Sequence, residues 1–353
     1  MKKIFLTTIA LLTMASASVF GMYGVDSGWI NFLTHGNQFR ARLDQLGFTL
    51  GNDTIKGTFG FNNNAGYGGV YGDLLSTANG GITYDFKPSI SMGLGYTSSL
   101  ISVGVGYNAT IGTGYKDNGK SYNPVAHTPV LVLNAMDNAF RMAIPIQVYA
   151  DGNTNAVSVD SQFRYYTGLD MFPEIRLYLR YGSFTTKTGG VTSKEGESFG
   201  FDFRLYFGSM VEEVALKPYV KLVYNGALGK YHDNTRVEAV KVMKKQQSGS
   251  PIIFAKNAWI LNLVAGLGLS ANSDIVSLYL EPSLGLKVNQ AGSADKNAKE
   301  TYGLGYDVYA EIYITPLKNL EWYFEASIGN LDANTKGVSF ASSTGITWYL
   351  PAL

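Results

Sequence analysis

The fold is most clearly indicated by two neighbouring stretches, SISMGLGY at residues 89–96 and ISVGVGYNATIG at residues 101–112. In both, apolar residues alternate with small or polar ones. Successive side chains of a β-strand point to opposite faces, so each stretch predicts a strand with one apolar and one polar face. The short Thr97-Ser98-Ser99 connection predicts a tight turn, so the two stretches form an antiparallel hairpin.

The same alternation recurs along the rest of the chain. Further examples lie at residues 140–148, 157–165, 175–181, 199–207, 259–286, 302–314, 322–328 and 340–350. These expected strands are roughly 9–14 residues long, which exceeds the ~5–6 of soluble sheets and suffices to cross a bilayer at a tilt. The pattern predicts an all-β fold, a transmembrane antiparallel up-and-down β-barrel resembling a porin. A soluble β-sandwich also alternates and is the alternative.

The number of strands follows from the same count. Candidates from Phe39 onward give about fifteen, whereas bacterial barrels use even numbers. A first strand within residues 26–34, around Trp29 to Leu33, raises the expected number to about sixteen and places both termini in the periplasm. Fourteen is also possible, because strand boundaries are poorly defined by sequence.

Composition supports a membrane barrel. Charged residues make up 16% of the 353 residues, aromatic residues 13%, and there are 41 glycines. Soluble domains carry about 25% charged residues. The formal net charge of +1 gives no electrostatic reason to expect a nucleic-acid partner. The chain has no cysteine, which excludes disulfides, thiolate chemistry and a lipidated N-terminal cysteine.

Residues 1–21 have the form of a secretory signal peptide. Lys2 and Lys3 precede an apolar run from Ile4 to Met14, and small residues follow. Cleavage after Ala17 or after Gly21 fits this pattern, and Gly21 is preferred. A membrane anchor is the alternative, but the run is shorter than the ~20 residues needed. The expected mature protein, residues 22–353, is one barrel.

Connections between the expected strands alternate between short and long, with one exception, residues 151–155, where a long connection is expected and the sequence indicates a short one. Short turns are expected near residues 51–53, 97–98, 137–138, 208–209, 272–273 and 318–319. Long surface loops are expected near residues 63–79, 113–124, 183–197, 226–256 and 289–300. Short periplasmic turns and long outer loops are typical of outer-membrane barrels, so the alternation predicts an orientation.

The polar faces of the expected strands carry charges of both signs. The candidate lumen-lining residues are Arg40, Arg42, Arg164, Arg176, Arg180, Asp202, Arg204, Glu281, Asp307 and Glu311, together with Lys56, Arg141, Asp160, Glu321 and Glu325. A water-filled lumen accommodates such side chains, whereas lipid does not. They either line a diffusion pore and set its ion preference or form cross-strand ion pairs that brace the barrel. Sequence leaves both interpretations open.

No pattern indicates catalysis, a metal or a cofactor. The three histidines, His35, His127 and His232, show no metal-ligand spacing, and nothing marks a nucleophile. The glycines at 104 and 106 loosely match a dinucleotide fingerprint, but that motif needs a turn and a helix where this alternation continues. We therefore expect these glycines to be small inward positions and the protein not to be an enzyme.

The longest expected loop contains a basic stretch, from Arg236 to Lys245, in which cations alternate with valines and a methionine. Such a stretch can form a short amphipathic helix that folds inward as a constriction or contacts anionic surface sugars. A solvated loop is the preferred interpretation.

Several motifs resemble a known family. They are Met22-Tyr23-Gly24, the block WINFLTHGNQFRAR at residues 29–42, GYTSSLI at residues 95–101 and HTPVL at residues 127–131. The sequence resembles the variable surface proteins of intestinal spirochaetes of the genus Brachyspira over its whole length. One departure from outer-membrane barrels in general is the C-terminus, which ends in Leu353 and not in an aromatic residue.

This resemblance implies an abundant surface-exposed protein of the outer membrane whose variants alter antigenicity. It implies a structural or host-interaction role and supplies no catalytic residues. A general diffusion porin for small hydrophilic solutes is the alternative. The expected partners are outer-membrane lipid, host antibodies or host surface molecules, and a homo-oligomer is possible.

Overall fold

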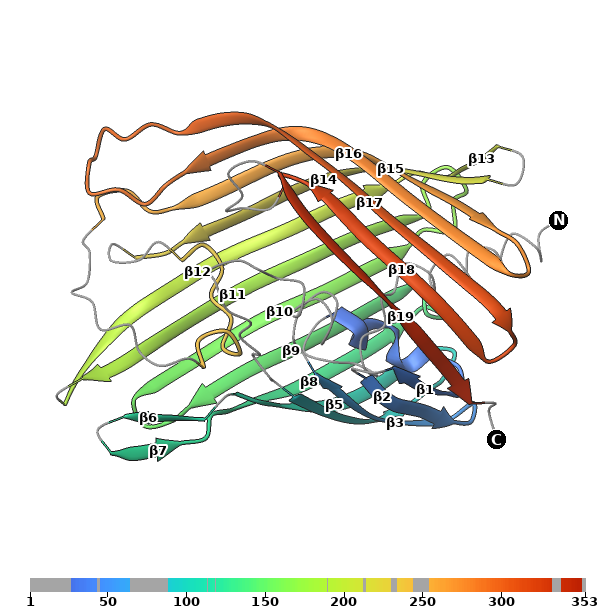
Figure 1. Ribbon diagram of the computed structural model, residues 1–353, viewed down its shortest axis with the longest axis horizontal. Helices are drawn as coiled ribbons and strands as arrows, with labels where there is room; N and C mark the ends of the chain where they lie inside the picture. Colours follow the sequence, from blue (N-terminus) through green and yellow to red (C-terminus); the bar gives the residue numbers. More distant parts are fainter. Residues whose placement is uncertain are drawn as a thin grey trace.

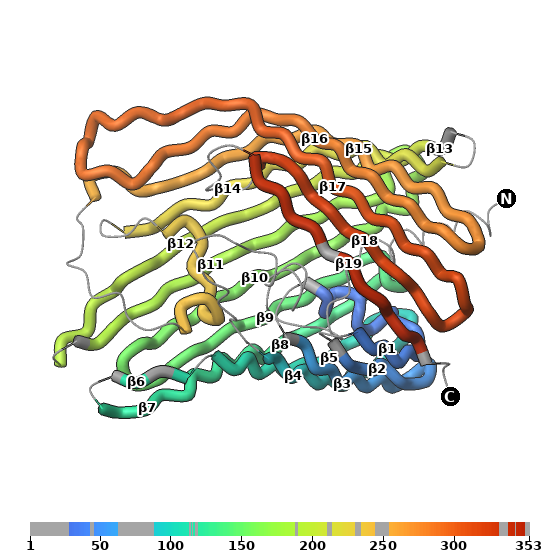
Figure 2. Tube along the Cα trace, in the orientation of Figure 1, coloured from blue at the N-terminus to red at the C-terminus, as the bar shows by residue number. Residues whose placement is uncertain are grey.

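The protein is a closed antiparallel β-barrel in the computed structural model (Figure 1). The structure describes residues 27–42, 45–63, 88–112, 114–117, 119–188, 190–211, 214–229, 234–243, 254–331 and 338–350. Consecutive strands lie side by side around the wall, as the tube in Figure 2 also shows. The expected signal peptide, residues 1–21, lies outside the described residues.

The strands follow one another along the chain, and most of them form the barrel wall. They are β1 (Gln38–Arg42), β2 (Gln45–Gly51), β3 (Ile55–Asn63), β4 (Pro88–Tyr96), β5 (Ile101–Ile111), β6 (Tyr115–Asp117), β7 (Lys120–Tyr122), β8 (Val125–Ala135), β9 (Phe140–Ala150), β10 (Thr154–Tyr166), β11 (Glu174–Thr188), β12 (Val191–Tyr206), β13 (Ser209–Val211), β14 (Val214–Ala227), β15 (Trp259–Asn272), β16 (Val276–Gln290), β17 (Thr301–Leu317), β18 (Leu320–Gly329) and β19 (Ser339–Leu350).

Pairing between the first and last strands closes the barrel. Phe39 of β1 lies opposite Leu350 of β19, and every other wall strand pairs with its neighbours in sequence. β6 and β7 form a separate small hairpin, and β13 pairs only with the start of β14. The described strands therefore make a sixteen-strand wall, which confirms the predicted fold and strand number.

The predicted alternation sets the two faces of the wall. On β5, Ser102, Asn108 and Thr110 are buried inside, whereas Val103 and Val105 are exposed outside. On β15, Leu263 is exposed and its neighbours Asn262 and Val264 are buried. Apolar side chains thus cover the outer surface, as a lipid environment requires.

The segment expected to be the first strand is a helix inside the barrel. The 3₁₀-helix η1 (Ser27–Thr34) contacts β5, β8, β9 and β10, and Trp29, Ile30 and Phe32 are fully buried. The predicted strand around Trp29 to Leu33 is therefore wrong. Its apolar residues occur in adjacent pairs that are three positions apart, which suits a helix and not the two-residue period of a strand.

Glycines of β4 and β5 provide the space for this helix. A Cβ atom on Gly93 or Gly106 would overlap the Trp29 ring, and one on Gly95 would overlap Leu33. The four glycines at 93, 95, 104 and 106 therefore form a seat for η1 on the inner wall. All four are inward positions on strands, as predicted for Gly104 and Gly106, and the structure gives the reason for their small size.

The two ends of the barrel differ. The short-turn end carries the turns at residues 52–54, 97–100, 136–139, 273–275 and 318–319, on the right in Figure 1. The long-loop end, on the left, carries the longer connections, including residues 112–124, 228–258 and 291–300. Residues 64–79 of the first expected loop lie outside the described residues. Within the described residues no helix is long and apolar enough to cross a membrane.

One expected loop is wrong. Residues 183–197 continue β11 and β12 as a hairpin whose last pair is Thr188 with Val191. Thr, Ser and Phe favour extended backbone, and a bulge between Phe184 and Thr185 keeps the ladder paired. These residues are polar because they belong to strands that extend beyond the apolar outer surface of the barrel, and not because they form a loop.

Candidate functional site in the barrel lumen

The predicted charged residues lie on the inner face of the wall. Arg40, Arg176, Asp202 and Glu311 are each at most 8% exposed, and their outward neighbours in sequence are more exposed. Arg42, Arg164, Arg180, Arg204, Glu281 and Asp307 occupy inward positions of the same alternation. The structure thus places the whole predicted set in one lumen and distributes it over several separate clusters.

A first cluster lies near the short-turn end of β11. Glu174 is only 1% exposed and accepts two hydrogen bonds from Arg176, at 2.5 and 3.0 Å. Lys217 Nζ of β14 donates to the same carboxylate at 2.8 Å. A buried carboxylate bound by two cations is satisfied, which braces β11 against β14.

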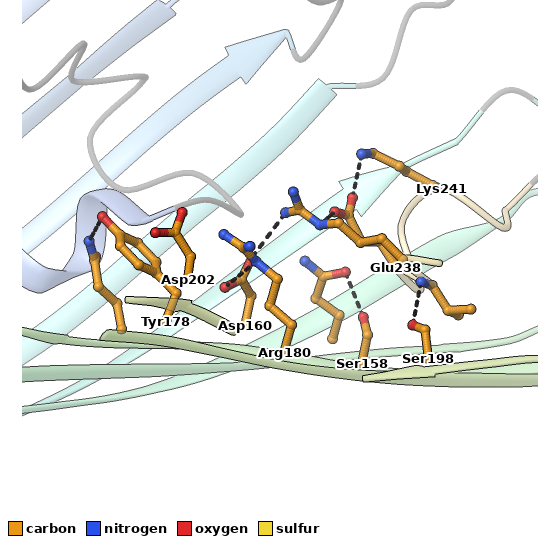
Figure 3. A network of polar contacts seen from close by, with 12 residues as sticks. Ser158, Asp160, Tyr178, Arg180, Ser198, Asp202, Glu238 and Lys241 are labelled. Atoms are coloured by element: carbon orange, nitrogen blue, oxygen red, sulfur yellow. Dashed lines mark hydrogen bonds and ion pairs between the residues drawn. The ribbon is translucent and has the colours of Figure 1, made fainter. Parts of the chain in front are cut away.

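A second cluster joins the wall to the segment between β14 and β15. Arg180 Nε donates to both oxygens of Asp160 at 3.1 and 3.2 Å, and Arg236 Nη2 donates to Asp160 at 3.0 Å. Glu238 forms an ion pair with Arg236 and another with Lys241 at 2.7 Å. Figure 3 shows this chain of contacts rising from the strands into the lumen.

The inner segment, residues 234–243, is held to the wall through its backbone. Val237 N donates to Ser198 Oγ at 2.7 Å, and Ala239 N donates to Ser158 Oγ at 2.9 Å. Val237, Ala239 and Met243 are at most 4% exposed. For residues 236–243, the preferred interpretation of a solvated loop is therefore wrong.

Packing explains why the inner segment folds inward. Ala239 and Met243 form an apolar cluster with Ala126, Tyr149 and Ala156 on the inner wall. Gly182 and Gly196 leave room for Val237, because a Cβ atom at either position would crowd this valine. Burying these apolar side chains offsets the cost of ordering the segment.

A third cluster, the ion pair of Arg204 with Asp202, lies near Tyr178. Arg204 binds its strand neighbour Asp202 through two hydrogen bonds of 2.8 and 2.7 Å. The Arg204 and Arg180 guanidinium groups lie 5.0 and 5.5 Å from the Tyr178 ring centre. Candidate residues of β11 and β12 thus lie around one tyrosine, and Arg180 binds Asp160 and not Asp202.

Tyrosines and glutamates line the other side. Tyr219 Oη donates to Glu281 at 2.8 Å, and Tyr313 Oη donates to Glu325 at 3.0 Å. Tyr279 and Tyr309 donate to Glu281 and Glu311 in the same way. Phenol donors satisfy carboxylate oxygens without supplying positive charge, so this wall stays acidic.

Two arginines of β1 close the ring of charges. Arg42 lies 3.8 Å from Glu321 and stacks on the Tyr323 ring at 3.9 Å. Arg40 lies two residues before Arg42 on the same face of β1, and it is buried opposite Tyr349 on β19. These contacts join the seam between the first and last strands.

Some lumen residues were not anticipated from sequence. Glu174 follows Pro173 at a strand start, and Lys217 and Lys221 lie on β14, which carried no expected site residue. The alternation within VALKPYVKLVYNGA places both lysines on one face and is the signal that would have found them.

The histidines take no part in a shared site within the described residues. His35 follows η1, and His127 faces outward on β8 with Nδ1 at 2.5 Å from Tyr107 Oη. His232 lies outside the described residues. In the described part of the chain, no group of three or more His, Asp or Glu side chains is arranged to hold a metal ion.

Comparison with protein families identifies the relatives of this barrel. The model of the Serpulina hyodysenteriae variable surface protein family matches residues 2–349. The chain belongs to this family. The family match and the barrel fold place this variable surface protein in the outer membrane, at the cell surface.

Solved structures similar to this variable surface protein are outer-membrane proteins as well. OmpT with loop L8 deleted, an outer membrane protein of Vibrio cholerae, is 9% identical, with 89% of this chain and 98% of that chain covered and a TM-score of 0.39. OmpT of Vibrio cholerae expressed in the outer membrane is 10% identical, with 89% and 97% covered and a TM-score of 0.37. No curated protein matches the chain.

Proposed function

We propose that this variable surface protein is a structural antigen whose long-loop end faces the host and whose barrel serves as its membrane scaffold. The β11–β12 hairpin carries the proposal. β10 pairs with β11 only as far as Thr186, and β14 pairs with β12 only from Ser198 onward, but the hairpin continues to Thr188 and Val191. Its tip therefore stands clear of the wall and is open to an antibody.

The contents of the lumen favour a scaffold over an open channel. Helix η1 occupies one side of the inner wall, and the inner segment crosses another. Outer-membrane lipid is the proposed partner of the outward apolar surface. Host antibodies or host surface molecules are the proposed partners of the exposed hairpins, whose Thr, Ser, Lys and Glu residues tolerate exchange.

Single-cysteine labelling tests the orientation, because the chain has no cysteine of its own. Thr192→Cys on the hairpin should react with a membrane-impermeant maleimide on intact cells. Lys318→Cys, in an exposed turn at the short-turn end, should react only after permeabilisation. Labelling of Lys318→Cys alone on intact cells would refute the proposed orientation.

Serum raised against intact cells tests the antigen role. Replacing residues 187–194 with a Gly-Ser turn should remove a large part of the serum binding, whereas replacing the 273–275 turn should not. Equal binding to both variants and to the native protein would contradict the antigenic role of the hairpin.

A second candidate, a diffusion porin for small hydrophilic solutes, is favoured by the partly exposed charges of the lumen. The side chains of Lys217 and Arg204 are 31% and 26% exposed. Planar-bilayer recording of the purified protein separates the two functions. Discrete, frequent channels in the native protein favour the porin, and their absence favours the scaffold.

A further inference from the structure

Basic residues form one row across five neighbouring strands of the lumen wall. Arg164 lies directly opposite Arg141 on β9 and Arg176 on β11, and the row continues through Arg204 on β12 to Lys221 on β14. Neighbouring strands are about 4.8 Å apart, so the row spans roughly 19 Å. It lies on the strands that run side by side from β9 to β14 in Figure 1.

The row is only partly neutralised. Like charges directly opposite each other in a sheet are destabilising. Glu174 binds Arg176, and Asp202 binds Arg204, but Lys221 forms no ion pair within the described part of the chain. The membrane-spanning inner faces of these five strands carry, among the described residues, the cations Arg141, Arg164, Arg176, Arg180, Arg204, Lys217 and Lys221 against the carboxylates Asp160, Glu174 and Asp202.

The next part of the wall, separated from β14 by β15, has the reverse balance. The described inner faces of β16, β17 and β18 carry the carboxylates Glu281, Asp307, Glu311, Glu321 and Glu325 against the single cation Lys287. A lumen polarised in this way repels an anion from one side and concentrates it on the other.

The row lies on the short-turn side of the inner segment. The inner segment binds Ser158 and Asp160 of β10. These two residues are nearer to the long-loop end than Arg164 is, because β10 runs from the long-loop end to the short-turn end. Arg204 retains 26% side-chain exposure and Lys217, next to the row, retains 31%. Part of the surface of Arg204 and Lys217 is therefore open on the short-turn side of the inner segment.

We propose that the row of Arg164, Arg176, Arg204 and Lys221 binds a small multivalent anion that carries phosphate or carboxylate groups and enters from the short-turn end. A guanidinium group has five N–H donors, and Arg176 and Arg204 each use two of theirs to bind Glu174 and Asp202, so others remain for an oxyanion. The spacing of about 4.8 Å between strands suits two charged groups of one molecule better than a single monovalent ion. This proposal does not depend on the antigenic role of the hairpins.

Calorimetric titration of the detergent-folded full chain tests the site, with pyrophosphate and citrate as probes at low salt. The double variant Arg164→Gln/Lys221→Gln should weaken binding about tenfold, because it removes two charge-assisted contacts and leaves Glu174 and Asp202 with their partners. Tighter binding of pyrophosphate assigns the site to phosphates, and tighter binding of citrate assigns it to carboxylates.

The matched control is Lys187→Gln/Lys194→Gln, which makes the same charge change on the β11–β12 hairpin beyond the row. It should keep the native affinity. Equal losses in both double variants, or no binding of either probe to the native protein, would overturn the proposal. Heat-modifiable gel mobility checks folding, and if the double variant fails to fold, Lys221→Gln alone must weaken binding measurably or the proposal fails.

Discussion

At the scale of single residues, four glycines and Lys56 determine how the N-terminal helix η1 sits in the lumen. Gly93, Gly95, Gly104 and Gly106 provide the seat, and the side chains of Trp29, Phe32 and Leu33 fill it. Lys56 Nζ donates to the His35 carbonyl at 2.5 Å and fixes the end of η1 to β3. Small substitutions at these positions should therefore displace η1 before they disturb the strands of the wall.

Gly106→Ala should displace Trp29, because the new methyl group would overlap its ring. Overpacking of this kind costs about 1–3 kcal/mol. The midpoint of urea unfolding in detergent, followed by tryptophan fluorescence, measures the loss. Gly57→Ala is the control, since its Cβ atom would meet nothing nearer than the Gly93 carbonyl at 3.9 Å. Equal stability of both variants would argue against the seat.

Burial, with help from nearby Lys56 and Arg40, lowers the pKa of His35 below its usual value, although its bond to the Gly36 carbonyl opposes this. The unfolded chain then binds a proton more readily than the folded one, so stability falls as pH drops below about 6.5. His35→Gln should reduce the loss of unfolding free energy between pH 7.5 and pH 5.5. An identical pH dependence in both proteins would exclude this role of His35.

At the scale of elements, η1 and the inner segment lie in the lumen, and the β11–β12 hairpin extends beyond the wall. The inner segment is attached by backbone donors to Ser158 and Ser198, with Ser158 also donating to Gln147 Oε1 at 3.0 Å. The apolar side chains of the segment pack on small residues of β8 and β10. Its position is therefore set by the wall and not by its own helical tendency.

Ser158→Ala/Ser198→Ala should loosen the inner segment, because two buried N–H groups lose their acceptors. Each loss costs about 1–3 kcal/mol. We expect planar-bilayer recordings to show larger or more frequent conductance steps than in the native protein. Ser161→Ala, on the opposite face of β10, is the control and should leave conductance unchanged. Unchanged conductance in the double variant would mean that the segment does not restrict the lumen.

At the scale of the whole molecule, closure of β19 onto β1 removes the sheet edges and separates lipid from lumen. Leu284 and Leu286 of β16 are 55% and 48% exposed outside, whereas Ser283 lies inside beside the Asp307 carbonyl at 3.3 Å. Adjacent residues thus meet opposite environments, and their tolerance to charge should differ accordingly.

Leu284→Arg should destabilise the barrel by about 2–4 kcal/mol, the cost of an arginine in the lipid layer near its midplane. Ser283→Arg, the matched change on the acidic inner wall, should cost far less. The fraction of heat-modifiable folded protein after refolding into lipid vesicles measures both. The reverse ranking would assign the wrong face of β16 to lipid.

The sequence predicts which charged side chains point into the lumen, but it does not predict which of them form ion pairs. Alternation correctly places Arg176, Asp202 and Glu311 inside, because which face a side chain takes depends only on its own strand. It does not pair Arg180 with Asp160 or Glu174 with Lys217, because those contacts depend on the register between strands. The threonine-rich residues 185–192 resemble a loop in sequence because polar residues are common in irregular backbone as well as in strands outside the lipid.

The two-residue period of the sequence predicts the barrel and the two faces of its wall, since this period is a local property of the backbone. The expected number of about sixteen strands agrees with the structure, although one of the strands included in it is the helix η1. Three further features are seen only in the folded chain: Trp29 to Leu33 form a lumen helix, residues 234–243 fold inward, and Arg164, Arg176, Arg204 and Lys221 share one row. These features arise where residues far apart in sequence meet, and the free space of the closed lumen and the strand register bring them together.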